Sequence, residues 1–86
     1  MYQVVLARAA QQSYEAAGAP FQRRLDRVFE QLAASPTSHP NVKRLQGALA
    51  GYYRYRLGDY RIVFSVDRSK ELVIIAVIEH RSRAYR

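Results

Sequence analysis

The sequence predicts an α+β fold, in which a small antiparallel or mixed β-sheet carries two N-terminal helices on one face. Three observations lead to this prediction. A β-branched run opens the chain, apolar residues then recur at helical spacing up to residue 35, and apolar and polar residues alternate after residue 41. The predicted order of elements is therefore βααββββ. A chain of 86 residues suits one domain, which we expect to span residues 1–86.

The N-terminal half contains one predicted strand and two predicted helices. Residues 2–6 form the β-branched run, which favours a buried strand. Residues 9–17 are strong helix formers, and Gly18 and Pro20 separate them from a second helix. That helix ends near Pro36, because the residue before a proline avoids helical geometry. Its apolar residues form one stripe with helical spacing: Phe21, Leu25, Val28, Phe29 and Leu32.

The C-terminal half is predicted to supply four strands, and the first strand is expected to pair with one of them. Strict alternation over residues 52–57 puts Arg54 and Arg56 on one face of the sheet, and tyrosines on the other. Since the helices cover one face only, the uncovered face is available to these arginines. Gly58 and Asp59 fit a two-residue hairpin turn. The predicted strands are residues 42–45, 52–57, 60–66 and 72–79, with a glycine-bounded loop at residues 47–51.

The composition is that of a small basic protein. The chain has 14 Lys and Arg against 7 Asp and Glu, a formal charge of +7, and 49% apolar residues. Such an apolar fraction indicates a folded scaffold whose charge suits a polyanionic partner. The absence of cysteine excludes disulfides, thiolate metal sites and cysteine nucleophiles, and we expect no cofactor and no metal. The longest apolar run, residues 72–78, is far shorter than a membrane span, so we expect a cytoplasmic protein without membrane contact.

Most of the positive charge falls in the predicted sheet, where ten basic residues and only four acidic residues follow Thr37. Guanidinium groups bind phosphate and tyrosines stack on unpaired bases, so this mixture favours binding of single-stranded nucleic acid. Arginines that are merely solvated on an open sheet face are the alternative. That alternative is weakest where like charges on neighbouring strands repel unless an anion relieves them. This cluster is Arg54, Arg56 and Arg61, and further candidate RNA contacts are Lys43, Arg44 and Arg83.

Residues near the C-terminus are candidates for chemistry. His80 closes the last predicted strand and is a candidate for proton transfer, with a purely structural role as the alternative. We expect Glu79 to orient His80 or to pair with Arg81. Tyr85 lies outside any periodic pattern and is open to contact a base, whereas the tyrosines at positions 53, 55 and 60 are expected to pack in the sheet.

Three segments carry a resemblance to a known family. They are residues 43–47 (KRLQG), residues 53–64 (YRYRLGDYRIVF), and His80-Arg81 followed by residues 84–86 (AYR). With these segments the chain resembles the RelE/ParE superfamily of toxins from bacterial type II toxin–antitoxin systems, over essentially its full length. The order of the predicted elements agrees with that family.

The RelE branch implies a ribosome-dependent endoribonuclease that cuts mRNA in the ribosomal A site without a metal ion. In that chemistry the 2′-hydroxyl attacks the adjacent phosphate and leaves a cyclic phosphate, which needs a base, an acid and positive charge. The resemblance places the two basic positions of the family's central strand on Arg54 and Arg56. It assigns phosphate binding to Arg61 and Arg81, and stacking on or orienting a base to Tyr85.

The chain departs from the family where lysines often stand. Arg54 and Arg56 occupy those positions, and arginine is a poor general base because it stays protonated. His80 is therefore the better candidate for proton transfer. The candidate catalytic set is Arg54, Arg56, Arg61, His80, Arg81 and Tyr85.

Two other functions stay open at this point. The ParE branch implies a protein that poisons DNA gyrase without a nuclease site, because one fold serves several functions. A non-catalytic nucleic-acid-binding module is the third reading, although His80, Arg81 and Tyr85 together favour the nuclease. Either toxin branch implies a cognate antitoxin with an acidic amphipathic segment that folds on binding. The nuclease branch also implies the ribosome and mRNA as partners.

Overall fold

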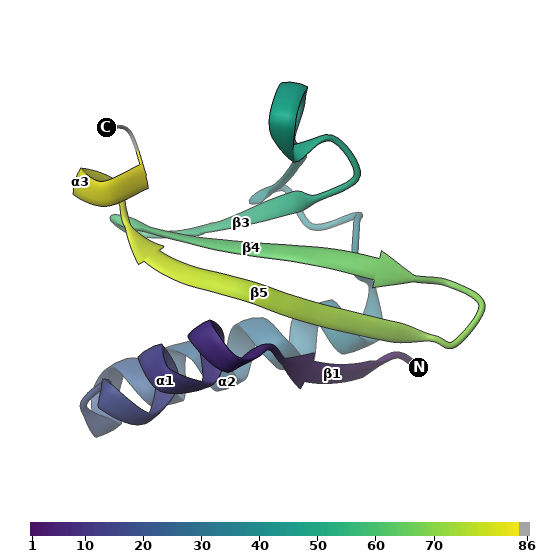
Figure 1. The fold of residues 1–86 in the computed structure, drawn as a ribbon. Coiled ribbons are helices and arrows are strands. Elements are labelled where there is room, and N and C mark those ends of the chain that lie inside the picture. The colour runs from purple at the N-terminus through teal and green to yellow at the C-terminus, as the bar shows by residue number, and fades with distance from the viewer. Residues whose placement is uncertain (85–86) are drawn as a thin grey trace.

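The computed structural model describes residues 1–84, which form one five-stranded sheet with two helices against one face (Figure 1). The predicted α+β fold and its order of elements are confirmed. Two short helical turns, η1 and α3, add to that order. The elements are β1 (Gln3–Leu6), α1 (Arg8–Ala16), α2 (Ala19–Ala34), β2 (Val42–Arg44), η1 (Gly47–Leu49), β3 (Tyr53–Leu57), β4 (Tyr60–Asp67), β5 (Leu72–His80) and α3 (Arg81–Ala84).

The sheet has the strand order β1-β5-β4-β3-β2. β1 lies parallel to β5, and the other neighbouring strands are antiparallel. The predicted pairing of the first strand with a later one is therefore confirmed. β5 lies between β1 and β4, an interior position that suits its continuous apolar sequence.

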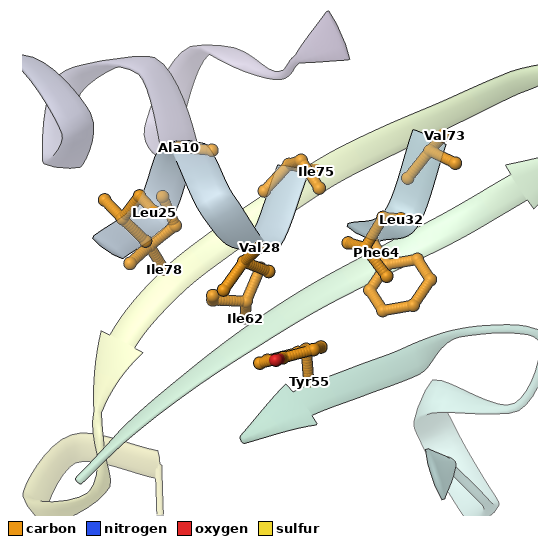
Figure 2. Packing of buried hydrophobic residues seen from close by; sticks show 10 residues of the cluster. All are labelled: Ala10, Leu25, Val28, Leu32, Tyr55, Ile62, Phe64, Val73, Ile75 and Ile78. Carbon is orange, nitrogen blue, oxygen red and sulfur yellow. The ribbon is translucent and has the colours of Figure 1, made fainter. Parts of the chain in front are cut away.

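One hydrophobic core lies between the two helices and the sheet (Figure 2). From the predicted stripe of α2, Leu25, Val28 and Leu32 are buried, and the two phenylalanines pack at the margin of the core. The sheet contributes Tyr55, Ile62, Phe64, Val73, Ile75 and Ile78 to the core.

Within residues 1–84, no helix is long and apolar enough to cross a membrane.

A β-bulge decides which residues of β5 face the core. Val63 pairs with Val77 while Phe64 pairs with Ile75, so Ala76 has no partner in β4. An extra residue in one strand shifts its alternation by one position. The inward residues of β5 are consequently Val73, Ile75 and Ile78. The continuous apolar run predicted the strand but carried no signal for this register.

The face of the sheet away from α1 and α2, called the open face below, is bordered by two helical turns (Figure 1). The first is η1, teal in Figure 1, in a segment that the sequence predicted as a plain loop. Gly47 begins this turn and Gly51 follows it, with φ of 69° and 93°, a region that favours glycine. The second is α3, which begins at Arg81, one of the C-terminal residues that the sequence marked as candidates for chemistry.

Candidate nucleic-acid interface

β3 presents its arginines on the open face because its other side is fixed in the core. Tyr55 is only 4% exposed, and its hydroxyl donates a hydrogen bond to Gln31 Oε1 at 2.7 Å. Alternation then points Arg54 and Arg56 to the open face, as the sequence predicted. Arg54 is half-buried and donates from Nη1 to the Asn41 carbonyl at 2.6 Å, whereas Arg56 is exposed.

Cross-strand pairing adds positive charge on both sides of β3. Lys43 of β2 lies opposite Arg54, and Arg61 of β4 lies opposite Arg56. Directly opposite residues share a face of the sheet, with Cβ atoms about 5 Å apart. The open face therefore carries four basic side chains on three adjacent strands. Such like-charged neighbours destabilise the sheet unless an anion compensates them.

Glu79 of β5 compensates one of these charges. Its Oε1 accepts hydrogen bonds from Arg61 Nη2 at 2.6 Å and from Arg61 Nε at 3.1 Å. Both side chains are largely buried, with 20% and 24% exposure. The expectation that Glu79 orients His80 or pairs with Arg81 is therefore wrong. Glu79 lies opposite Arg61 in the antiparallel pair of β4 and β5, so the two share a face that His80 does not.

Arg81, at the start of α3, is tied to the β3–β4 turn. Its backbone N–H donates to the Asp59 carbonyl at 2.7 Å, and its Nη1 lies 3.6 Å from Asp59 Oδ1. Gly58 gives the turn its shape with φ of 60°. Asp59 is thus the turn residue that the sequence predicted and also the group that holds Arg81.

Arg81 and the three arginines of the open face converge on one small hollow at this end of the sheet. Arg54, Arg56, Arg61 and Arg81 line it together with the turn and Tyr60. The hollow has a volume of about 20 Å³, room for about one water molecule, so side chains must move for a phosphate to enter. Among residues 1–84, neither Arg54 nor Arg56 forms an ion pair, which leaves two uncompensated positive charges at the hollow.

His80 lies away from that hollow. It follows Glu79 along β5, so its ring points to the side of the sheet that carries the helices, where it meets the Tyr60 ring edge-on at 5.1 Å. There it lines a separate groove of about 590 Å³ with Phe21 and Ser13. His80 Nδ1 accepts the Ser82 N–H at 3.2 Å, so the neutral ring carries its proton on Nε2.

The remaining predicted contacts are placed less centrally. Lys43 belongs to the open face at the sheet edge, whereas Arg44, the next residue of β2, points to the opposite side and is exposed. Of Arg83, only the backbone in α3 is described, and Tyr85 lies outside the described residues. Sequence reasoning missed Glu79 as the partner of Arg61 and Asp59 as the partner of Arg81. The signal for the first was the antiparallel pairing, once its register is known.

Comparison with solved structures finds the same fold in several small toxins. Its fold matches the RelE–RelB complex of Pyrococcus horikoshii OT3 with a TM-score of 0.80 and 26% identity, over 95% of this chain and 97% of that one. The RelBE2 toxin–antitoxin complex of Mycobacterium tuberculosis matches with a TM-score of 0.80 and 23% identity, over 93% and 98% of the two chains. A YoeB/ParE toxin from Agrobacterium tumefaciens matches with a TM-score of 0.81 and 18% identity, over 91% and 96%.

These matches define the class as RelE-like toxin folds. At the level of sequence, the profile of the ParE toxin of the type II toxin–antitoxin system parDE matches residues 4–85. The chain therefore belongs to the ParE toxin family, within the RelE/ParE superfamily of type II toxin–antitoxin toxins. No curated protein sequence matches it significantly.

Proposed function

We propose that this toxin is a ribosome-dependent mRNA endoribonuclease that inhibits translation in the cytoplasm. The observation that carries the proposal is the convergence of Arg54, Arg56, Arg61 and Arg81 on one hollow. Phosphoryl transfer gathers negative charge on the phosphate oxygens in the transition state, and guanidinium groups fixed around that position stabilise it. Two of these arginines have no carboxylate partner among residues 1–84, so they are available to a phosphate.

The reaction starts at the 2′-hydroxyl of the nucleotide before the scissile bond. A general base takes the proton of the 2′-hydroxyl as the 2′-oxygen forms a bond to phosphorus, the bond from phosphorus to the 5′-oxygen breaks, and a general acid gives a proton to the leaving oxygen. The products are a 2′,3′-cyclic phosphate and a 5′-hydroxyl, and no metal ion is needed. The four arginines supply charge and not the base, because they stay protonated.

Proton transfer is proposed for His80, and Tyr85 is proposed to stack on or orient a base, as the superfamily resemblance implies. His80 lies on the other side of the sheet from the arginine hollow, but Tyr60 lines both that hollow and the groove of His80. An RNA strand that contacts both the arginine hollow and His80 must therefore pass around the end of β5. Since Nδ1 of His80 accepts the Ser82 N–H, the proton available for transfer is the one on Nε2.

A cognate antitoxin is proposed as the partner that neutralises the toxin. The chain has a net charge of +7, and the open face bears uncompensated arginines. An acidic segment that folds on this surface would compensate them and would cover the hollow. Two of the solved structures that this fold matches, from Pyrococcus horikoshii OT3 and E. coli, are complexes of RelE with RelB.

Gyrase inhibition is the second candidate, because the family profile that matches is that of the ParE toxin. In that case the open face is a binding surface for a protein or for DNA, and no bond is cut. Its arginines would contribute to affinity, while His80 and Tyr85 would be dispensable.

The deciding experiment is cleavage of a defined mRNA on programmed ribosomes. The Arg56→Gln and Arg81→Gln variants are suited to it, since both side chains are exposed and neither anchors the core. We expect each variant to lose at least tenfold in cleavage rate, and a 2′-deoxy nucleotide at the cleavage site to abolish it. Arg23→Gln on the exposed side of α2 removes the same charge and is the matched control.

The same preparation is tested on DNA gyrase for stabilised cleavage complexes. Intact mRNA together with gyrase-dependent DNA breaks contradicts the nuclease and supports the second candidate. Cleavage that survives both arginine substitutions contradicts the placement of the site at the hollow.

A further inference from the structure

Of the three tyrosines in and next to β3, Tyr52 differs from the other two because its side chain is exposed. Tyr53 stacks on Phe64 with ring centroids 5.6 Å apart, and Tyr55 is buried. Tyr52, directly before β3, is 37% exposed. Among residues 1–84 the other exposed large hydrophobic residues are Met1, at 92%, and Leu49, at 38%. A phenol ring at such a position is free to meet a ligand.

Tyr52 belongs to the open face. Its neighbour Tyr53 faces the core, so alternation turns Tyr52 to the side of Arg54 and Arg56. Successive residues on one face of a strand lie about 6.6 Å apart, twice the rise per residue. Tyr52, Arg54 and Arg56 therefore form an evenly spaced row along one strand. Such a row suits an extended single strand, in which phosphates and bases also repeat at regular steps.

The backbone holds Tyr52 in position. Its N–H donates to the Leu49 carbonyl at 3.0 Å, and its carbonyl accepts from the Leu45 N–H at 2.9 Å. These bonds continue the β2–β3 ladder to the C-terminal end of η1. A hollow of about 260 Å³ adjoins Tyr52 at this end of the β2–β3 pair, but its lining includes Arg44 and Tyr53, which lie on the other face of the sheet. The stacking role therefore rests on the exposed ring and on its place in the row.

We propose that Tyr52 stacks on an unpaired base of a single-stranded nucleic acid whose phosphates lie on Arg54 and Arg56. The inference rests on the proposed function and adds a base-contacting residue to it. Stacking on an aromatic ring tolerates every base, because each base has a π-face. Tyr52 therefore positions the nucleic acid more than it selects a base sequence. The ring is needed and the hydroxyl is not.

The test measures binding of a fluorescently labelled ten-nucleotide oligouridylate by anisotropy at several salt concentrations. Loss of one stacking contact weakens binding by about 5-fold to 150-fold, the fold-change equivalent to the range for stacked bases. We expect Tyr52→Ala to show a loss in this range and Tyr52→Phe to bind as the native protein does. Leu49→Ala, three residues away and equally exposed, is the matched control and should change affinity less than twofold.

The salt dependence separates stacking from charge. The slope of log Kd against log salt reflects the number of phosphates contacted, about 0.7 per phosphate for a single strand. Tyr52→Ala should therefore keep the native slope, whereas Arg56→Gln should reduce it by about one contact. Native affinity in Tyr52→Ala, with weakened binding in Arg56→Gln, overturns the role of Tyr52 alone. Absence of oligouridylate binding by the native protein, even at low salt, overturns the stacking role, whereas the cleavage assay on programmed ribosomes decides the proposed function separately.

Discussion

Two carboxylates hold two of the four arginines at the hollow before any ligand is present. Glu79 accepts two hydrogen bonds from Arg61, and Asp59 lies 3.6 Å from Arg81. A carboxylate and a phosphate present similar oxygen pairs to a guanidinium group. Glu79 therefore fixes the orientation of Arg61 and at the same time competes with a phosphate for it. Arg54 and Arg56 face no such competition among residues 1–84.

We predict that Glu79→Gln binds single-stranded RNA several-fold more tightly than the native protein. The substitution releases Arg61 and raises the net charge by one unit. It should also lower the free energy of unfolding by up to about 1 kcal/mol, the upper range for an ion pair that water partly screens. Anisotropy with the labelled oligouridylate and urea denaturation measure the two effects. Glu30→Gln, an exposed position on α2, changes the net charge equally. An equal gain in affinity for that control would assign the effect to net charge alone.

At the scale of elements, α1 and α2 are joined by polar contacts beside their shared core. The Tyr14 hydroxyl donates to Asp26 Oδ1 at 2.8 Å, and Gln22 Nε2 donates to the Tyr14 carbonyl at 2.8 Å. Tyr14 also contacts Phe29, with ring centroids 6.2 Å apart. The hydrogen bond to the Asp26 carboxylate raises the pKa of Tyr14 above its usual value, because ionisation would remove the donated proton beside a negative charge.

This contact predicts a pH-dependent contribution to stability. A raised pKa in the folded state means that the contribution is complete below the ordinary tyrosine pKa of 10.0 and is lost as the pH rises through the folded value. We expect Tyr14→Phe to lower the urea midpoint slightly at pH 8, and the difference from the native protein to shrink above pH 10. RNA binding should not change, since Tyr14 is on α1 and not on the open face. A difference that stays constant across this pH range would exclude the hydrogen bond as its source.

At the scale of the whole molecule, the sheet separates two roles. The face covered by α1 and α2 holds the core (Figures 1 and 2). The open face holds the charge. Because the helices cover only one side, arginines on the other side are free of packing demands. The core is correspondingly small. Marginal stability of about 5–15 kcal/mol is typical of a protein of this size, so a single core cavity removes a large part of it.

We predict that Leu25→Ala lowers the free energy of unfolding by about 2–5 kcal/mol, because it leaves a cavity between α2 and the sheet. Leu25 is 0% exposed and lies near Ile78 in Figure 2. Leu49→Ala is the matched control, since that leucine is 38% exposed and its truncation should change stability by less than about 0.5 kcal/mol. Urea denaturation compares the two. Equal losses in both variants would contradict the core described here.

Much of the fold was predictable because it follows from local patterns. The helical spacing of the apolar residues in α2 predicted both the helix and its buried side. The alternation at residues 52–57 predicted the face of the sheet on which Arg54 and Arg56 lie. The β5 register was not predictable, because a continuous apolar run looks the same in any register. The candidate site was predicted in part. Its arginines were named from the sequence, but their carboxylate partners depend on which strands are neighbours.

The sequence by itself determined the order of elements, the helix that covers the sheet, the positive charge of the open face and the resemblance to a toxin superfamily, since each depends on residue type and spacing. Only the tertiary structure decided that Glu79 pairs with Arg61, that Arg81 joins the hollow through Asp59, and that His80 turns to the other side of β5. These contacts arise between residues 18 to 22 positions apart, or from the side of a strand on which a residue falls after a bulge. Such relations are set by strand pairing and packing, which act between segments and leave no mark in the local sequence.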